Sequence, residues 1–374
     1  MMTNPCFSGV SLRVSEARLH YPSGEEVHTA ASGRVDALHE IFLEIGTETG
    51  FCGLGEIRAN IAFITGTPES RVLPGIVGLL RAIDWRKEPA AILRDLPMPG
   101  AGFPKISRAL VENALVDGLG RAEGRTACSF LGGAWQRAVP CNQCIFWGDD
   151  AAMHRLAERY WAEGFRSIKL RVGIGTLDDD HRRAAWLRER FGDDLHLAVD
   201  ANGAWTPSAS LAAIARLGPL GIDYVEQPTS PGDWGALEEV GRATDIPIMI
   251  DEGLQGEHDI ALLCRQAPRF SAHLKIAKAG GALAMVKIGR RLDRHGVSYV
   301  VGQMNEGTVA TATAIHCAMA LKPMFGELYG ALGLLDDPAS GVSYAGGQVS
   351  VRERPGFGVS FDPSLTRTLW ISES

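Results

Sequence analysis

The sequence predicts an α/β protein whose central part is a barrel of parallel strands that alternate with helices. Short apolar runs end in Asp200, Glu226, Asp251 and Lys275, at intervals of 26, 25 and 24 residues. Such an interval fits one strand, one helix and two short loops. Between the runs, helical periodicity is found in the segments 178–191, 208–217, 234–244 and 282–295. A repeated strand–helix unit forms a parallel sheet, and charges at its strand ends belong at the mouth of a barrel.

The acidic residues at the strand ends predict a metal site. Parallel strands are buried on both faces, so an acid that ends such a strand lies at the rim of the barrel. Three carboxylates held together would repel one another and have raised pKa values unless a cation neutralised them. A hard divalent cation with oxygen ligands, most simply Mg²⁺, is therefore expected at Asp200, Glu226 and Asp251. The alternative is that these residues are solvated acids at the rim.

Composition and charge exclude several classes of partner. A length of 374 residues suits one barrel with an appended smaller domain. The formal net charge of −7 argues against a nucleic acid or an anionic membrane as partner. The N-terminus lacks the features of a signal peptide and no apolar run is long enough to cross a bilayer, so we expect a cytoplasmic protein. The odd number of cysteines, seven, predicts reduced thiols, with Cys141 and Cys144 buried rather than forming a redox or zinc motif.

Patterns in the first 133 residues predict a small α+β domain. Residues 9–19 and 37–55 alternate in the manner of antiparallel strands, with tight turns at the glycines of 50–55 and a loop at 21–33. Helices are expected at 68–83 and 104–123, the second of them amphipathic. The barrel should begin with a strand at 139–146, and its seventh and last strands are expected at 297–303 and 325–328.

Five short motifs, in their order and spacing, resemble the enolase superfamily. They are Lys169-Leu-Arg171, Asp200-Ala-Asn202, Glu226-Gln-Pro, Asp251-Glu252 and Lys275-x-x-Lys278-x-Gly-Gly. The resemblance covers nearly the whole chain and is to the muconate-lactonizing-like subgroup of the mandelate racemase/muconate lactonizing enzyme family. It implies a modified TIM-type (β/α)7β barrel with an α+β capping domain built from the N-terminus and the C-terminal tail, whose loops close over the substrate. We expect the cap at 1–133, the barrel at 134–335 and a segment packing back on the cap at 336–374.

The same resemblance implies roles for individual residues. Asp200, Glu226 and Asp251 match the Mg²⁺ ligands, and Lys275 matches the base on the sixth strand. Lys169 matches the first lysine of the second-strand pair, while Arg171 stands where the family usually has its second, catalytic lysine. Residues expected to support a ligand or to contact the substrate are Asn202, Glu252, Glu306, Trp147 and Glu327.

Several of these assignments have a structural alternative. Lys275 could be an ion-pair partner of Glu306 or Asp251 rather than a base. Glu252 could be an exposed loop acid, and Trp147 an ordinary rim or core tryptophan rather than a stacking platform. Lys278 is expected to be a structural or supporting group in a loop.

The chemistry implied is Mg²⁺-dependent removal of the α-proton of a small carboxylate substrate, through a metal-stabilised enediolate. Arginine is effectively never deprotonated in proteins, so Lys275 is the only conventional base unless Lys169 reaches the substrate. A single base suits elimination, and we expect a dehydratase-type lyase acting on a hydroxy acid or a hydroxylated amino or imino acid. Alternatives are a racemase, an epimerase or a cycloisomerase of the same superfamily.

Two further alternatives belong to other classes. A Schiff-base aldolase would also place a lysine on a barrel strand, but it has no use for three metal-binding acids. The second alternative is a non-catalytic member of the superfamily that binds acids without converting them. Arg171, in place of the usual catalytic lysine, supports this alternative. The resemblance also implies a homo-oligomer.

Overall fold

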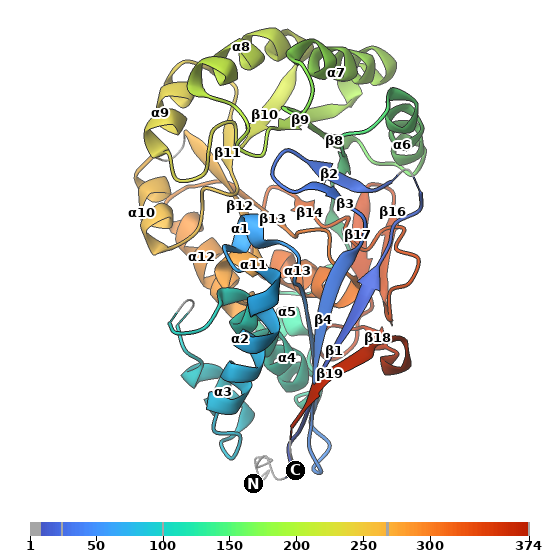
Figure 1. Cartoon of the computed structure of the whole chain (residues 1–374), viewed down its shortest axis with the longest axis vertical. Coiled ribbons are helices and arrows are strands. Elements are labelled where there is room, and N and C mark those ends of the chain that lie inside the picture. The colour runs from blue at the N-terminus through green and yellow to red at the C-terminus, as the bar shows by residue number, and fades with distance from the viewer. Residues whose placement is uncertain (1–8, 24, 99–100, 267–268, 373–374) are drawn as a thin grey trace.

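The computed structural model describes residues 9–23, 25–98, 101–266 and 269–372, which form a barrel and a cap (Figure 1). The cap sheet is antiparallel, with its strands in the order β19-β1-β4-β5. These strands are β1 (Ser11–Leu19), β4 (Leu38–Gly46), β5 (Cys52–Arg58) and β19 (Arg367–Ile371). The helices of this part of the chain are α1 (Ala62–Thr65), α2 (Glu69–Ala82), α3 (Pro89–Asp95), α4 (Lys105–Ala122) and α5 (Ala127–Phe130).

Parallel strands form the barrel, in the order β14-β13-β12-β11-β10-β9-β8-β7. They are β7 (Gln143–Ile145), β8 (Ser167–Arg171), β9 (His196–Asp200), β10 (Ile222–Glu226), β11 (Ile248–Ile250), β12 (Phe270–Lys275), β13 (Tyr299–Gly302) and β14 (Gly326–Glu327). A bridge between Cys141 and Gly326 joins the two ends of the sheet. The connecting helices are α6 (Asp150–Ala162), α7 (Leu177–Phe191), α8 (Pro207–Leu217), α9 (Trp234–Arg242), α10 (Glu257–Gln266), α11 (Ile276–Ala279), α12 (Ala282–Arg294) and α13 (Thr308–Ala320).

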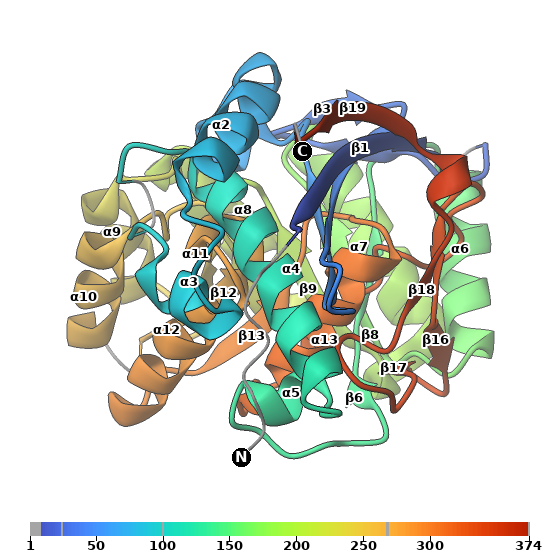
Figure 2. The same ribbon diagram turned by 90° about the horizontal axis from the view of Figure 1, so that it is seen from below.

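The C-terminal segment contacts both parts of the molecule. Strand β19 pairs with β1 in the cap sheet, where the two lie side by side (Figure 2). Strands β16 (Val342–Ala345) and β17 (Gln348–Val351) form a hairpin that pairs with β6 (Val139–Pro140), and β15 (Ala339–Ser340) pairs with β18 (Ser360–Phe361). The predicted fold class, a modified TIM-type (β/α)7β barrel with an α+β cap, is confirmed.

Helix α4 is the main support of the cap sheet, and it differs from the prediction. It was expected to be amphipathic, but residues 106–107 and 109–120 are all buried. The glycines of 50–55 also do more than form turns, because Gly53 and Gly55 lie within strand β5. A Cβ on either glycine would overlap the backbone of α4, so these residues allow the helix to pack directly against the sheet.

Two other local predictions were wrong. The expected loop at 21–33 includes one strand of a hairpin formed by β2 (Val27–Thr29) and β3 (Gly33–Val35), whose Val27 is buried beside Leu19 and Leu38. The single strand expected at 139–146 is two strands, since β6 pairs with the C-terminal hairpin and only β7 joins the barrel. Between the two strands, the N–H of Cys141 donates to the carbonyl of Gly347 and that of Asn142 to the carbonyl of Gly326, so the chain passes there from the C-terminal hairpin to the barrel.

The described residues include no helix that is long and apolar enough to cross a membrane.

Candidate active site

Side chains from the C-terminal ends of neighbouring barrel strands converge on one buried region. Arg171, Asp200 and Glu226 end β8, β9 and β10, and the ladder pairs Arg171 with Asp200 and Asp200 with Glu226. Asp251 follows β11 directly, and Lys275 ends β12. Each of the five residues is at most 5% exposed. The register of the parallel strands therefore brings together the residues that the sequence separates by about one strand–helix unit.

Lys169 is a buried counter-ion of three acids. It lies two residues before Arg171 and is 0% exposed. Its Nζ is 2.7 Å from Glu327 Oε1, 2.9 Å from Glu226 Oε2 and 3.3 Å from Asp200 Oδ2. Burial opposes its charge, yet the carboxylates of Glu226 and Glu327 raise the pKa of Lys169 above its ordinary value. The structure thus places Lys169 inside the barrel and ties it to carboxylates from three strands.

Arg171 neutralises Asp200. Its Nη1 donates to Asp200 Oδ2 and, at 3.3 Å, to Asn202 Oδ1. The backbone N–H of Asn202 donates to Asp200 Oδ1 at 2.9 Å, and its Nδ2 donates to Glu252 Oε1 at 2.9 Å. Asn202 has a φ of 46°, a left-handed conformation that asparagine tolerates better than most residues. The turn after β9 therefore places the Asn202 side chain between the two acids.

Asp251 is held by two lysines. Lys275 Nζ lies 2.5 Å from Asp251 Oδ2, and Lys278 Nζ lies 2.6 Å from Oδ1. Lys278 also donates to the backbone carbonyls of Asp251 and His273, at 2.6 and 2.8 Å. It was expected in a loop, but it lies in α11 and is buried, and this burial lowers its pKa. Although burial works in the opposite direction, the two ammonium groups lower the pKa of Asp251.

A histidine that the sequence analysis did not single out lies among these acids. His273 is two residues before Lys275 on β12, so both side chains point to the same face of the strand. Its Nδ1 is 2.8 Å from Glu226 Oε1 and 4.0 Å from Asp251 Oδ2. In the part of the chain that the structure describes, Glu226, Asp251 and His273 form a group whose ligand atoms lie within 4.8 Å of one another, and Asp200 does not belong to it. A lone histidine in an apolar strand is usually a core residue, so no sequence signal distinguished it.

The absence of a side chain at Gly302 leaves room for the imidazole of His273 on the neighbouring strand. In the pairing of β12 with β13, Gly302 lies opposite Lys275, and a Cβ on Gly302 would overlap His273 Nε2. We expect Gly302→Ala to lower the free energy of unfolding by about 1–3 kcal/mol, because the imidazole and its neighbours must shift. Urea unfolding measures this change, and Gly148→Ala is the control, since a Cβ there meets no atom within 4 Å. Equal losses in the two variants would contradict the packing argument.

Three further acids that the sequence analysis singled out, Glu252, Glu306 and Glu327, are all buried. Glu327 lies in the barrel interior, where it accepts from Lys169 and, at 3.0 Å, from Asn142 Nδ2. Glu306 is buried and accepts the N–H of Met304 at 3.2 Å, and burial raises its pKa. Glu252 is also buried, rather than an exposed loop acid, and burial together with the charge of Asp251 raises its pKa.

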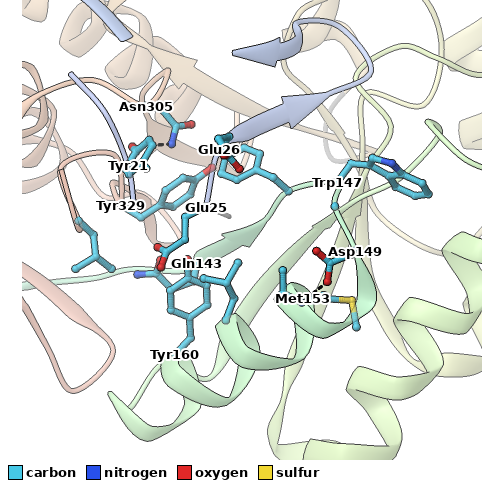
Figure 3. Close-up of a pocket in the computed structure, with 15 residues that line it drawn as sticks. Tyr21, Glu25, Glu26, Gln143, Trp147, Asp149, Met153, Tyr160, Asn305 and Tyr329 are labelled. Atoms are coloured by element: carbon cyan, nitrogen blue, oxygen red, sulfur yellow. Dashed lines mark hydrogen bonds between the residues drawn. The ribbon is translucent and has the colours of Figure 1, made fainter. Parts of the chain in front are cut away.

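A pocket beside Arg171 is lined by aromatic side chains from the cap and the barrel (Figure 3). These residues are Tyr21, Phe146, Trp147, Tyr160 and Tyr329. The Arg171 guanidinium lies 5.6 Å from the centroid of the Phe146 ring, and Tyr329 donates its hydroxyl to Glu327 at 3.4 Å. The Trp147 ring points away from Tyr329 in Figure 3, and the Arg183 guanidinium lies over it at 4.7 Å.

The chain is similar to known enzymes over most of its length. The family described as "Enolase C-terminal domain-like" matches residues 152–365. An N-succinyl-L-Arg/Lys racemase from Bacillus cereus is 29% identical over 71% of this chain and 72% of the racemase. Muconate cycloisomerase 1 from Pseudomonas putida is 27% identical over 90% of this chain and 87% of the cycloisomerase.

A solved structure agrees with this similarity. The dipeptide epimerase from Enterococcus faecalis, in complex with Mg and the dipeptide L-Leu-L-Tyr, superimposes with a TM-score of 0.84 at 27% identity. The superposition covers 95% of this chain and 100% of the epimerase. Because the family match spans more than half of the sequence and the folds agree throughout, the chain belongs to the enolase superfamily and is an enzyme of its mandelate racemase/muconate lactonizing enzyme family.

Proposed function

We propose that this enzyme removes the α-proton of a small carboxylate substrate with Lys275 as the base, and eliminates a β-hydroxyl group from a hydroxy acid or a hydroxylated amino or imino acid. The proposal rests on the different ion pairs that three cations near the strand ends form. Lys169 is tied to three carboxylates at 0% exposure, and Arg171 cannot act as a base. Lys275 is paired with Asp251 alone among the described carboxylates.

A single base is sufficient for elimination. Lys275 accepts the α-proton, the electrons of the C–H bond form a C=C bond, and the β-carbon–oxygen bond breaks. The ammonium group of Lys275 then returns the proton to the leaving hydroxyl group, which departs as water. Inversion of the α-carbon would require a second acid or base on the opposite face, where Arg171 provides a fixed charge instead.

The residues present fit a divalent cation. Asp200, Glu226 and Asp251 offer buried carboxylates at three neighbouring strand ends, with Glu226 and Asp251 close to His273. The buried Glu252 Oε2 and His273 Nε2 have no hydrogen-bond partner in the described residues. Oxygen-rich sites of this kind suit Mg²⁺ or Mn²⁺. When bound, the cation would supply positive charge to the substrate carboxylate as negative charge develops on it. Lys278 would then hold Asp251 in place through its Oδ1, which leaves Lys275 for the proton transfer.

Removal of the metal should abolish turnover and lower thermal stability. A cation bound at about 100 times its Kd stabilises the folded state by about 2.7 kcal/mol, so EDTA should lower the Tm by a few degrees. Differential scanning calorimetry and a turnover assay, each with EDTA and then with added Mg²⁺ or Mn²⁺, measure both effects. Full activity after exhaustive chelation would contradict the assignment.

Racemisation or epimerisation is the second candidate, because relatives bear those names; cycloisomerisation is a third. Product analysis separates the classes. The enzyme is incubated with Mg²⁺ or Mn²⁺ and a panel of hydroxy acids, sugar acids, N-acylated amino acids, dipeptides and hydroxylated prolines, and the mixture is followed by ¹H NMR. New vinyl, enamine or 2-oxo acid signals support the lyase, whereas an epimer without these signals supports the second candidate. Ligands that raise the Tm without any turnover would support a non-catalytic, acid-binding protein.

A further inference from the structure

Arg183 in α7 is a buried cation that no carboxylate of the described residues holds in an ion pair. The residue is 1% exposed, and burial disfavours the charged guanidinium and lowers the pKa of Arg183. Asp180 lies one turn earlier on the same helix, but its Oδ2 accepts the N–H of Gly173 at 2.9 Å. A buried charge without an ionic partner is costly, so its hydrogen bonds indicate what the residue contributes.

The guanidinium of Arg183 joins the ends of the first two barrel strands. Nη2 donates to the backbone carbonyl of Phe146, directly after β7, at 2.9 Å, and Nη1 donates to the carbonyl of Arg171, at the end of β8, at 3.1 Å. The ladder between these strands ends one residue earlier, at Ile145 and Leu170. A planar guanidinium can donate to two carbonyls at once in a fixed geometry. Arg183 therefore continues the connection between β7 and β8 beyond their last ladder pair, at the rim of the barrel.

The indole of Trp147 lies against the same guanidinium. The Cζ of Arg183 is 4.7 Å from the centroid of this ring, which points away from Tyr329 in Figure 3. The backbone N–H of Trp147 donates to the carbonyl of His28 in β2 at 3.1 Å. A Cβ on Gly175 would overlap the indole, so the loop after β8 also packs closely against it. Arg183 is thus connected through Trp147 to the cap hairpin.

Both strand ends that Arg183 holds belong to the candidate active site. Arg171 donates from Nη1 to Asp200 and, at 3.2 Å, from Nε to the Sγ of Cys144. Phe146 lines the pocket beside Arg171, and the guanidinium of Arg171 lies 5.6 Å from the centroid of that ring. Arg183 itself does not line the pocket. A displacement of about 1 Å at a reacting centre can cost about 10²-fold in rate, so the two carbonyl contacts have consequences for catalysis.

We propose that Arg183 is a positioning residue for the reaction, because it holds the backbone of Arg171 and Phe146 at a fixed separation. The fixed charge of Arg171 and the ring of Phe146 then face the substrate in one arrangement. Arg183 acts through these two residues and does not touch the substrate. The role rests on the proposed function, since it requires a reaction, but it is the same for elimination, epimerisation and cycloisomerisation.

The first test is a double-variant cycle of Arg183→Met, Arg171→Met and the two combined, assayed with an acid that the wild type converts. Arg183→Met should lower kcat by about 10- to 100-fold and change KM less than kcat. The loss in the combined variant should fall short of the product of the two single losses by at least about fivefold, because the two residues act together. The matched control is Arg182→Met, which removes the exposed neighbour on α7 that pairs with Asp150 and Asp179. Its kcat should equal that of the wild type.

Hydrogen–deuterium exchange measured by mass spectrometry supplies a readout that needs no substrate. The N–H groups of Trp147 and Val172 belong to the same peptide groups as the two carbonyls, and they donate to β2 and β9 at 3.1 and 3.0 Å. Peptides covering 146–148 and 171–173 should exchange at least about tenfold faster in Arg183→Met, while the peptide of α13 keeps its wild-type rate. General destabilisation would accelerate exchange in all of these peptides.

Arg183→Lys is the second variant, and it replaces Arg183→Met in both tests if circular dichroism shows that the methionine variant is unfolded. Lysine keeps the positive charge, but a single ammonium group does not reproduce the planar fork that spans two carbonyls. Its kcat and its exchange rates should therefore lie between those of the wild type and those of Arg183→Met. Wild-type values for both in Arg183→Lys would contradict the bridging role.

Three further outcomes would overturn the proposal. The first is a kcat of Arg183→Met within about twofold of the wild type. The second is a combined variant whose loss equals the product of the two single losses. The third is unchanged exchange at both strand ends. A wild-type enzyme that converts no acid would instead contradict the proposed function, and the exchange rates would then decide alone whether Arg183 holds the two strand ends.

Discussion

Replacement of Lys275 by alanine should reduce turnover by about 10³-fold or more, because removal of a positioned general base typically costs 10²–10⁴-fold and the neighbouring Lys169 is held by three carboxylates. Metal binding should persist, since the substitution removes a cation from Asp251 Oδ2 and leaves that carboxylate more accessible. Steady-state kinetics and Mn²⁺ titration calorimetry measure the two effects separately.

The matched control for this variant is Lys287→Ala, which removes an exposed lysine from α12. Its turnover should equal that of the wild type. If Lys275→Ala retained more than about a tenth of wild-type activity, another group would have to take the proton, which contradicts the role of Lys275 as the base.

Replacement of Lys169 by methionine should have the largest effect on stability. The substitution removes the shared counter-ion of Asp200, Glu226 and Glu327 and leaves their carboxylates buried close together. Removing one partner of a buried ion pair costs about 3–5 kcal/mol in the free energy of unfolding. Urea unfolding in the presence of EDTA measures the loss without compensation by a bound cation.

Lys322→Met is the control for this second variant, because Lys322 is exposed in the loop that follows α13. Its free energy of unfolding should be unchanged within experimental error. A loss below about 1 kcal/mol in Lys169→Met would show that the three acids do not need this cation. A double variant, Lys169→Met with Glu327→Gln, should recover part of the loss, since one negative charge is removed.

The sequence predicted the strand ends well because their pattern is local. An apolar run that ends in a charge is visible within a few residues, and parallel pairing then brings successive ends together, as with Arg171, Asp200 and Glu226. Helices such as α7 and α8 were predicted within one residue of their ends for the same reason. The division into segments 1–133, 134–335 and 336–374 stays a prediction.

The remaining features depend on contacts between distant parts of the chain. Lys169 and Glu327 are 158 residues apart and meet only because the barrel closes, so their ion pair has no local signal. The strand period shows that Lys169 and Arg171 face the same side. It does not show that Lys169 meets three carboxylates while Arg171 contacts Asp200 and the ring of Phe146. His273 depends on the space left by Gly302 on the next strand, which the pattern of β12 does not indicate.

The fate of the substrate α-proton in D₂O distinguishes elimination from epimerisation at Lys275. Wild-type enzyme with Mg²⁺ or Mn²⁺ is incubated with the panel of acids, and the α-proton signal is followed by ¹H NMR alongside any new resonances. We expect loss of that signal from at least one β-hydroxylated acid together with vinyl, enamine or 2-oxo acid resonances, and neither change with Lys275→Ala. Deuterium incorporation that yields only the epimer would contradict it, because Lys169 or Arg171 would then have to act as a second acid or base.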